Sequence, residues 1–174
     1  MLVFDRIMVD IGDDQSLEND LSTDSSFLVN MKEMLTKADG KTLVLIDEFG
    51  SGTEPAAGGA IAEAILSELD KRGTYGVITT HYTNLKLYAS ADTGVMNGAM
   101  MFDVKNIAPL FKLEMGLPGN SFAFELARKM GLPEAIIKDA ENRAGEEFVG
   151  IERNLRKIAR NRKALDEKLE RIKH

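Results

Sequence analysis

The stretch Leu43-Val-Leu-Ile-Asp-Glu48 decides the fold, because a short apolar run rich in β-branched residues ends there in two adjacent carboxylates. The turn-forming pair Asp39-Gly40 precedes this run, and a second run, Gly76-Val-Ile-Thr-Thr80, follows Arg72-Gly73. Both patterns predict fully buried strands of the parallel type. Residues 56–71 lie between them and are rich in Ala, Ile and Leu at helical spacing. A strand, a helix and a strand at this length form a βαβ unit, so the sequence predicts an α/β fold.

A further helix is expected upstream of this unit. Ser25 or Ser26 can cap its amino terminus, and its apolar positions run from Phe27 to Leu35. The helix should end near Gly40, where the next strand begins. Helices and strands therefore alternate, as in a mostly parallel sheet with flanking helices.

The pattern changes after His81. Residues 94–104 and 107–115 are expected to form two strands of an antiparallel hairpin at the end of the sheet. Residues 121–130 and 133–143 are expected to form two helices, separated by a break at Gly131-Leu-Pro133.

The last part of the chain shows a heptad pattern. Its apolar positions are Ile151, Leu155, Ile158, Leu165, Leu169 and Ile172. Arg162 occupies the polar position of this seam. The pattern fits an amphipathic helix lying on its own domain, or the start of a short coiled coil that depends on a partner. We therefore expect one domain over residues 1–143 and an amphipathic helix over residues 144–174.

Composition limits the possible functions of the 174 residues. The chain has no cysteine, which excludes disulfides and thiolate zinc sites, and the sequence shows neither a signal peptide nor an apolar stretch long enough to cross a membrane. We expect a cytoplasmic protein without a membrane partner. Residues 151–174 contain nine Lys or Arg and four Asp or Glu, whereas residues 1–150 contain 13 and 24. The acidic part should repel a phosphate backbone, so any DNA should be bound by other regions of a longer protein.

The pair Asp47-Glu48 resembles a Walker B motif. A buried parallel strand delivers both carboxylates to the carboxyl end of the sheet, which is where such sheets bind ligands. The resemblance implies that Asp47 holds Mg²⁺ through water, and that Glu48 orients or deprotonates the water that attacks the γ-phosphate of ATP. Alternatively, the pair is a strand end whose acids cap the following turn.

Two neighbouring features favour the nucleotide interpretation. Ser51, Gly52 and Thr53 lie in a turn of small residues, which lets the backbone approach a phosphate or a neighbouring subunit closely. His81 follows the second strand and can reach the γ-phosphate. The only other histidine is His174, so catalysis by imidazole would depend on His81. The alternative is a solvated or purely structural histidine.

Together these segments resemble the ATPase domain of MutS proteins, which are related to ABC-type ATPases. The matching segments are Leu43-Val-Leu-Ile-Asp-Glu-Phe-Gly-Ser-Gly-Thr-Glu-Pro55, Thr79-Thr-His-Tyr82 with Leu85-Lys86, Leu117-Pro-Gly-Asn-Ser-Phe-Ala-Phe-Glu125 with Gly131-Leu-Pro133, Asp10-Ile-Gly-Asp-Asp-Gln-Ser16 and Leu21-Ser-Thr-Asp-Ser-Ser26. The last three favour the second type of MutS protein, associated with suppressing recombination. The resemblance implies an ABC-type P-loop NTPase-like fold that uses ATP and Mg²⁺.

The resemblance also assigns roles upstream of the Walker B strand. Gln15 stands where these ATPases keep a glutamine that contacts Mg²⁺ or its water. Ser22 and Ser25 belong to a segment that caps the ATP of the partner subunit in a homodimer, and Ser25 is the candidate for its γ-phosphate because of its expected place at a helix amino terminus. Asp24 departs from the family pattern, and its carboxylate would repel that phosphate.

A phosphate-binding loop of the form G-x-x-x-x-G-K-[ST] is not found in the chain. Gly40-Lys41-Thr42 matches its final triplet, but position 35 is Leu rather than Gly, and a strand rather than a helix follows. In the family this loop precedes the glutamine segment, so it would lie upstream of Met1. We therefore expect a truncated nucleotide site with poor affinity for ATP and no activity of its own.

Three functions remain in competition. The first is a piece of a dimeric DNA-repair or recombination-control ATPase that couples ATP binding and hydrolysis to DNA binding. The second is a non-catalytic dimerisation module with a heptad tail. The third is an ABC-type ATPase of another pathway, such as a transporter, which the absence of an L-S-G-G-Q signature disfavours.

Overall fold

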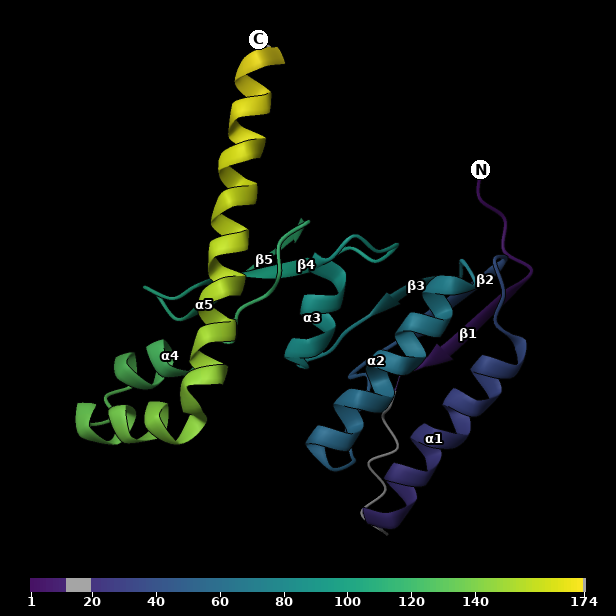
Figure 1. Ribbon diagram of the computed structural model, residues 1–174, viewed down its shortest axis with the longest axis horizontal. Helices are drawn as coiled ribbons and strands as arrows, with labels where there is room; N and C mark the ends of the chain where they lie inside the picture. Colours follow the sequence, from purple (N-terminus) through teal and green to yellow (C-terminus); the bar gives the residue numbers. More distant parts are fainter. Residues whose placement is uncertain (12–19, 174) are drawn as a thin grey trace. The chain divides into compact units, whose positions relative to one another are not determined.

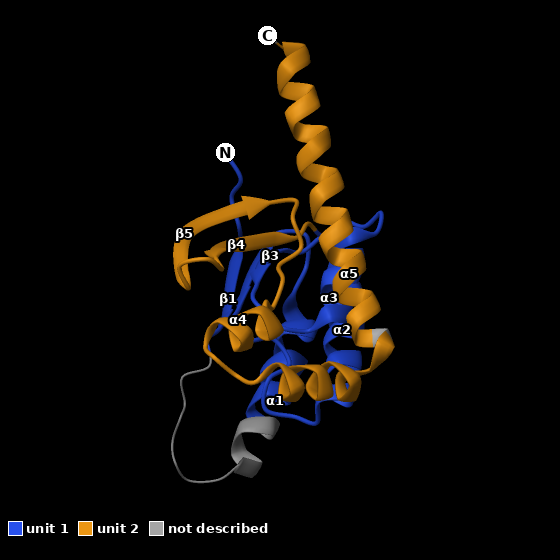
Figure 2. Ribbon diagram, turned by 90° about the vertical axis from the view of Figure 1, so that its left-hand side faces the viewer, with its two compact units in different colours: residues 1–95 blue, residues 96–174 orange. Residues whose placement is uncertain are grey.

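The computed structural model describes residues 1–11 and 20–173. The chain forms two compact units, Met1–Val95 and Met96–His174 (Figure 2). The first contains strands β1 (Arg6–Asp10), β2 (Thr42–Ile46) and β3 (Tyr75–Ile78) and helices α1 (Asp20–Lys37), α2 (Pro55–Lys71) and α3 (Thr83–Ser90). The second contains β4 (Gly98–Asp103), β5 (Ala108–Met115), α4 (Ala123–Lys129) and α5 (Glu134–Lys173). The chain is therefore a mixed α/β protein.

The first unit is built on a parallel sheet with the strand order β1-β2-β3 (Figure 1). Ile46 at the end of β2 pairs with Asp10 of β1 and with Ile78 of β3. The βαβ unit expected around Asp47 is thus confirmed as β2-α2-β3. The strand β1, which was not predicted, extends the sheet beside β2.

One face of this sheet carries the core. Helices α1 and α2 lie side by side (Figure 1), and Val44 and Ile46 of β2 are buried beneath them. The buried side chains of the helices are Phe27, Met31, Met34 and Ala38 of α1 and Ala62, Ile65, Leu66 and Leu69 of α2. This spacing matches the helical period, so the apolar stripes of the sequence become the core.

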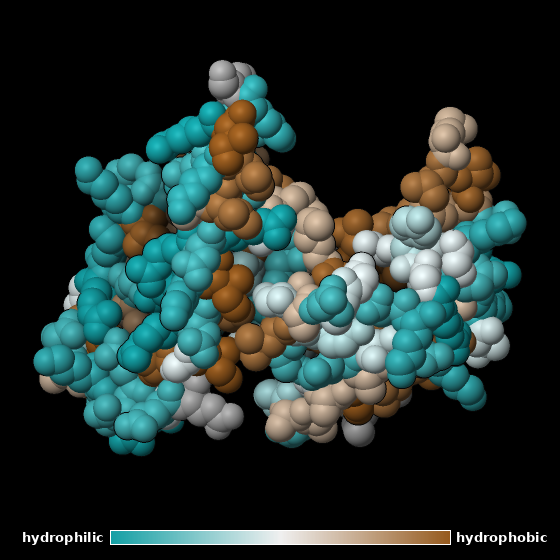
Figure 3. Space-filling view, turned by 45° about the horizontal axis from the view of Figure 1, so that its top comes forward, coloured by the Kyte–Doolittle hydropathy of each residue, from teal (hydrophilic) through white to brown (hydrophobic). Residues whose placement is uncertain are grey.

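The opposite side chains of the sheet remain exposed. Val77 of β3 is 64% exposed, and Ile7 and Val9 of β1 are 62% and 53% exposed. Figure 3 shows patches of hydrophobic residues on a surface that is otherwise mainly hydrophilic. The prediction of a fully buried second strand is therefore wrong, because β3 lies at the sheet edge and the described core covers only one face.

The turn before β2 confirms that Gly40-Lys41-Thr42 is not a phosphate-binding loop. Asp39 closes the turn, since its carboxylate accepts hydrogen bonds from the Lys41 N–H at 2.8 Å and from the Thr42 hydroxyl at 3.0 Å. Thr42 is fully buried and begins β2. The hydrogen bonds to Asp39 hold its pKa below the ordinary value.

The start of α1 differs from the expectation. The helix begins at Asp20, so Ser25 and Ser26 lie within it, and their predicted capping role is wrong. Its end agrees with the prediction and is fixed from outside. The Arg72 side chain donates hydrogen bonds to the carbonyls of Leu35 and Ala38, which satisfies the free carbonyls of the last turn.

In the second unit, β4 and β5 form the predicted antiparallel hairpin, in which Gly98 pairs with Met115. The hairpin is a two-stranded sheet of its own, so its predicted place at the end of the parallel sheet is wrong. Helices α4 and α5 follow as expected. Within α5 the backbone of Gly145 leaves the helical region (φ 86°, ψ 157°), which divides the helix into two segments.

The second segment of α5 carries the heptad seam, and burial changes along it. Leu155 is buried, and Arg156 forms an ion pair with Glu125 of α4 at 2.6 Å. Further along, Leu165 and Ile172 are 54% and 81% exposed. Of these apolar seam positions, burial is therefore greatest near the start of the segment.

Candidate functional site

The carboxyl ends of the three parallel strands bring the candidate residues together. β1 ends at Asp10, and Asp47 and Thr79 directly follow the last residues of β2 and β3. The backbone N–H of Asp47 donates to the carbonyl of Asp10 at 2.9 Å, and that of Thr79 donates to the carbonyl of Ile46 at 2.9 Å. The expected position of Asp47 at the carboxyl end of the parallel sheet is therefore seen in the structure.

Thr79 connects directly to the acidic pair. Its hydroxyl lies within hydrogen-bond distance of the Asp47 carboxylate oxygen Oδ1, and it accepts a hydrogen bond from the backbone N–H of Glu48 at 2.9 Å. The carbonyl of Thr79 also accepts a hydrogen bond from Phe49 N–H at 2.9 Å. The end of β3 thus fixes the backbone that carries both acids.

Glu48 has an unusual backbone conformation. Its φ is 50°, in the left-handed region that non-glycine residues rarely adopt. The next residue, Phe49, is buried and meets the ring of Phe27 edge-on, with ring centroids 5.8 Å apart. The side chains of Asp47 and Glu48 remain exposed. The corner therefore anchors one residue in the core while presenting two carboxylates to solvent.

The turn after Phe49 is held by Tyr82. The Tyr82 hydroxyl donates to the carbonyl of Gly50 at 2.7 Å, and a Cβ added at Gly50 (φ 83°) would lie 2.5 Å from the Tyr82 ring. Gly58 is equally restricted, because a Cβ there would lie 2.6 Å from Thr53 Cγ2 and from the Tyr82 hydroxyl. Ser51 and Gly52 are exposed at the tip of this turn, and Thr53 is half-buried.

Glu54 ends the turn by capping α2. Its carboxylate accepts hydrogen bonds from the N–H groups of Ala56 at 3.1 Å and Ala57 at 2.8 Å. These bonds hold the pKa of Glu54 below its ordinary value. Pro55 follows at the start of the helix, where its missing N–H costs nothing. The turn from Ser51 to Thr53 therefore has both ends fixed.

His81 lies beyond the end of β3 and is exposed. Its neighbours are fixed: the Thr80 hydroxyl accepts from the N–H of Tyr82 at 3.1 Å, and Asn84 donates to Glu63 of α2 at 2.7 Å. The structure therefore places the imidazole on the segment that connects β3 to α3, two residues after Thr79.

For three predicted site residues, the structure describes no side-chain position. Gln15 lies outside the described residues. Ser22 and Ser25 are in α1, but their side chains are not among those described. The predicted helix amino terminus at Ser25 is not found, since α1 continues on both sides of it.

Asp10, Thr79 and Tyr82 were not identified as site residues from the sequence. Burial raises the pKa of Asp10, and its carboxylate accepts a weak hydrogen bond from Asn30 at 3.5 Å. A signal existed for Thr79, which lies near the carboxyl end of the predicted strand 76–80. Asp10 carried none, because β1 was not predicted. Tyr82 carried no comparable signal, because its contact with Gly50 depends on the folded chain.

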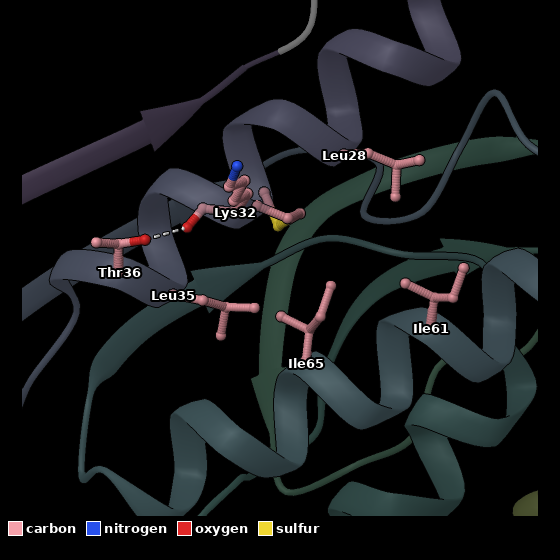
Figure 4. A pocket seen from close by; sticks show the side chains of 7 residues that line it. Leu28, Lys32, Leu35, Thr36, Ile61 and Ile65 are labelled. Carbon is pink, nitrogen blue, oxygen red and sulfur yellow. Dashed lines mark hydrogen bonds between the residues drawn. The ribbon is translucent and has the colours of Figure 1, made fainter.

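The structure contains an apolar hollow elsewhere, between α1 and α2 (Figure 4). Leu28 and Leu35 of α1 face Ile61 and Ile65 of α2 across it, and Lys32 lies at its rim. None of the lining residues is a candidate site residue. Among residues 1–11 and 20–173, no group of three or more acidic or histidine side chains has the arrangement of a metal site. The same residues contain no helix long and apolar enough to cross a membrane.

Comparison with known proteins identifies the family to which this chain belongs. The family model of MutS domain V matches residues 1–147. The chain therefore belongs to the MutS family, as the motifs around Asp47 and His81 predicted.

Curated proteins of the MutS2 type are similar to this chain over most of its length. The "Endonuclease MutS2" of Halothermothrix orenii is 41% identical over 98% of this chain and 22% of its own length. Those of Geobacillus kaustophilus and Lachnospira eligens are 43% and 47% identical over 95% and 86% of this chain and 21% and 19% of their own lengths. These matches confirm the second type of MutS protein expected from the sequence. The chain spans about a fifth of the length of these relatives.

Proposed function

We propose that this chain forms the magnesium-binding and water-activating part of the nucleotide site in a MutS2-type ATPase. The observation that carries the proposal is the convergence of Asp47, Glu48 and Thr79 at the carboxyl ends of β2 and β3, with His81 two residues further on. A P-loop NTPase-like arrangement of the complete domain, with residues 1–143 as its part and 144–174 as an appended helix, agrees with this geometry.

The donor set at the sheet end fits Mg²⁺. This ion is usually held by one or two carboxylates together with waters and substrate phosphates. Asp47 supplies an exposed carboxylate whose Oδ1 is oriented by Thr79, which leaves Oδ2 to face the ion or its water. Gln15 would supply a second contact. Bound Mg²⁺ would neutralise negative charge on the phosphates of ATP.

Glu48 would act as the general base. Its carboxylate accepts a proton from the attacking water as the water oxygen bonds to the γ-phosphorus and the bond to the bridging oxygen of ADP breaks. His81 would donate a hydrogen bond to the γ-phosphate. Ser51, Gly52 and Thr53 would line the nucleotide through their backbone, because this turn is exposed and fixed at both ends.

The complete site would need a second subunit and further regions of the protein. Ser22 and Ser25 would meet the ATP of a partner subunit in a homodimer, and ATP turnover would be coupled to DNA held by other regions. These regions would supply the phosphate-binding loop and the basic DNA-contacting surface, since residues 1–150 are strongly acidic. We expect the 174 residues alone to lack ATPase activity.

The test is Glu48→Gln in a full-length protein that contains this chain. Loss of the base should lower steady-state ATP turnover about 100-fold or more while ATP remains bound, measured by phosphate release and by filter binding of labelled ATP. Glu146→Gln, a matched change at an exposed glutamate of α5, should leave turnover unchanged. Near-normal turnover of the Glu48 variant would refute the assignment.

The exposed seam of α5 favours a second function, a dimerisation module. Leu165, Leu169 and Ile172 are 54%, 47% and 81% exposed at heptad spacing, which fits the start of a coiled coil. If this function holds, the 174-residue chain should sediment as a dimer, and Leu169→Asp should make it monomeric without lowering its helix content. A monomeric wild-type chain would exclude it.

A further inference from the structure

One residue at the end of β3, Thr79, holds the acidic corner at four points. Its N–H donates to the carbonyl of Ile46, and its carbonyl accepts from Phe49, both at 2.9 Å. Its hydroxyl accepts from the N–H of Glu48 at 2.9 Å and donates to the Asp47 carboxylate. The two backbone contacts could be made by any residue except proline, but the two hydroxyl contacts require Thr or Ser.

The hydrogen bond that the Thr79 hydroxyl donates restricts the Asp47 carboxylate. An exposed carboxylate on a short side chain rotates freely unless a donor fixes it, and a hydrogen bond to an ionised oxygen is among the stronger ones in proteins. Because Thr79 occupies Oδ1, the other oxygen of Asp47 keeps one direction. Loss of a hydrogen-bond partner that orients a metal ligand in this way typically lowers metal affinity or activity about 10- to 100-fold.

The hydrogen bond that the Thr79 hydroxyl accepts restricts the Glu48 backbone. A left-handed conformation at a non-glycine residue costs on the order of 1–3 kcal/mol and persists only where its surroundings hold it. At Glu48 (φ 50°) the N–H is fixed by the Thr79 hydroxyl, and the following Phe49 is anchored in the core. The Thr79 hydroxyl therefore helps to set the direction in which the Glu48 side chain leaves the backbone.

We propose that Thr79 is a positioning residue of the ATPase site, whose hydroxyl orients Asp47 toward Mg²⁺ and holds Glu48 in its left-handed conformation. This inference rests on the proposed function. It assigns to the hydroxyl a role separate from folding, because the backbone contacts of Thr79 do not involve the hydroxyl and would remain in a variant that lacks it.

The experiment compares Thr79→Val, which removes the hydroxyl at nearly constant volume, with Thr79→Ser, which keeps it. In a full-length protein that contains this chain, Thr79→Val should raise the Mg²⁺ concentration for half-maximal ATPase activity about 10-fold and lower kcat about 10-fold or more. Thr79→Ser should stay close to wild type in both quantities. The matched control is Thr74→Val, since the buried Thr74 hydroxyl has no hydrogen-bond partner in the described part of the chain.

A second readout needs no nucleotide. Hydrogen exchange measured by mass spectrometry should show faster exchange at the amides of residues 47–49 in Thr79→Val, and unchanged exchange there in Thr79→Ser and Thr74→Val. Should Thr79→Val fail to fold, Thr79→Ala replaces it in both measurements.

The outcomes separate this inference from the proposed function. Wild-type Mg²⁺ dependence and exchange in Thr79→Val would overturn the role of Thr79, and so would equal losses in Thr79→Val and Thr79→Ser. Either result leaves the nucleotide site standing if Glu48→Gln abolishes turnover. Normal turnover of Glu48→Gln refutes the proposed function itself.

Discussion

The corner after β2 and the second segment of α5 are built in opposite ways. The corner, residues 47–54, is held by residues far away in the sequence: Thr79 bonds Asp47, and Tyr82 bonds Gly50. The α5 segment, residues 146–173, is fixed at its start, where Leu155 is buried, and exposes apolar side chains towards its end. The corner therefore depends on long-range contacts at residues 47–50, whereas the helix depends mainly on local periodicity. Substitutions should expose this difference.

The largest effect is expected for removal of a core ring at the corner. Phe49 is 1% exposed, so Phe49→Ala should lower the free energy of unfolding by about 3–5 kcal/mol through lost burial and a cavity. Leu169→Ala in α5 removes a side chain that is 47% exposed and should cost less than about 0.5 kcal/mol. Urea unfolding followed by circular dichroism measures both. Similar losses would contradict the contrast between the two regions.

The next effect concerns function rather than stability. His81→Ala in a full-length protein that contains this chain should lower ATP turnover about 100-fold, as removal of a donor to a developing charge does in other enzymes. His174→Ala changes the only other histidine and should leave turnover unaltered. Steady-state phosphate release is the measurement. Equal turnover of the two variants would remove His81 from the site.

The same substitution should have opposite signs in the two regions. In the first turn of α2, which packs against the corner at Thr53, Gly58→Ala places a Cβ 2.6 Å from Thr53 and Tyr82 and should destabilise the protein by about 1–3 kcal/mol. In α5, Gly150→Ala meets nothing within 4 Å and should stabilise it by about 0.5–1 kcal/mol, because alanine favours the helix. Thermal unfolding of both variants measures the pair. A stabilising Gly58→Ala would show that the turn is loosely packed.

The smallest effect is expected at Glu54 and depends on pH. The N–H groups of Ala56 and Ala57 lower the pKa of Glu54 in the folded protein from its ordinary value of 4.5. The cap therefore contributes its full stability above this value and loses it as the pH falls through the lower folded pKa. Glu54→Gln should reduce the fall in the unfolding temperature between about pH 6 and about pH 3. An unchanged fall would mean that the carboxylate is not charged in the cap.

Local patterns were sufficient to predict much of the fold. The apolar run before Asp47 and the helical spacing of residues 56–71 predicted β2 and α2 correctly, since each is decided by neighbours in sequence. The strand β1 was missed because its exposed Ile7 and Val9 form no clear pattern, and its pairing with β2 stabilises it. The exposure of β3 also depends on which faces the helices cover.

The candidate site was predictable as chemistry but not as geometry. Asp47, Glu48 and His81 could be selected because strand ends and acid pairs are visible in the sequence. Their supports could not, since the hydrogen bonds of Thr79 and Tyr82 join residues about 32 positions apart and exist only after the sheet has formed. The start of α1 at Asp20 was missed because Ser25 and Ser26 look like caps although the helix continues through them.

The bend at Gly145 has a consequence for the heptad seam of α5. The helical backbone is interrupted there (φ 86°, ψ 157°). The direction in which Leu155 and Leu169 point around the helix axis therefore depends on their spacing from Gly145 and not on their spacing from the start of α5. A residue inserted before Gly145 would leave the seam on the same face of the second segment. A residue inserted between Leu155 and Leu169 would turn the distal apolar positions by about 100° away from the proximal ones. Gly145 thus sets the rotational phase of the C-terminal helix.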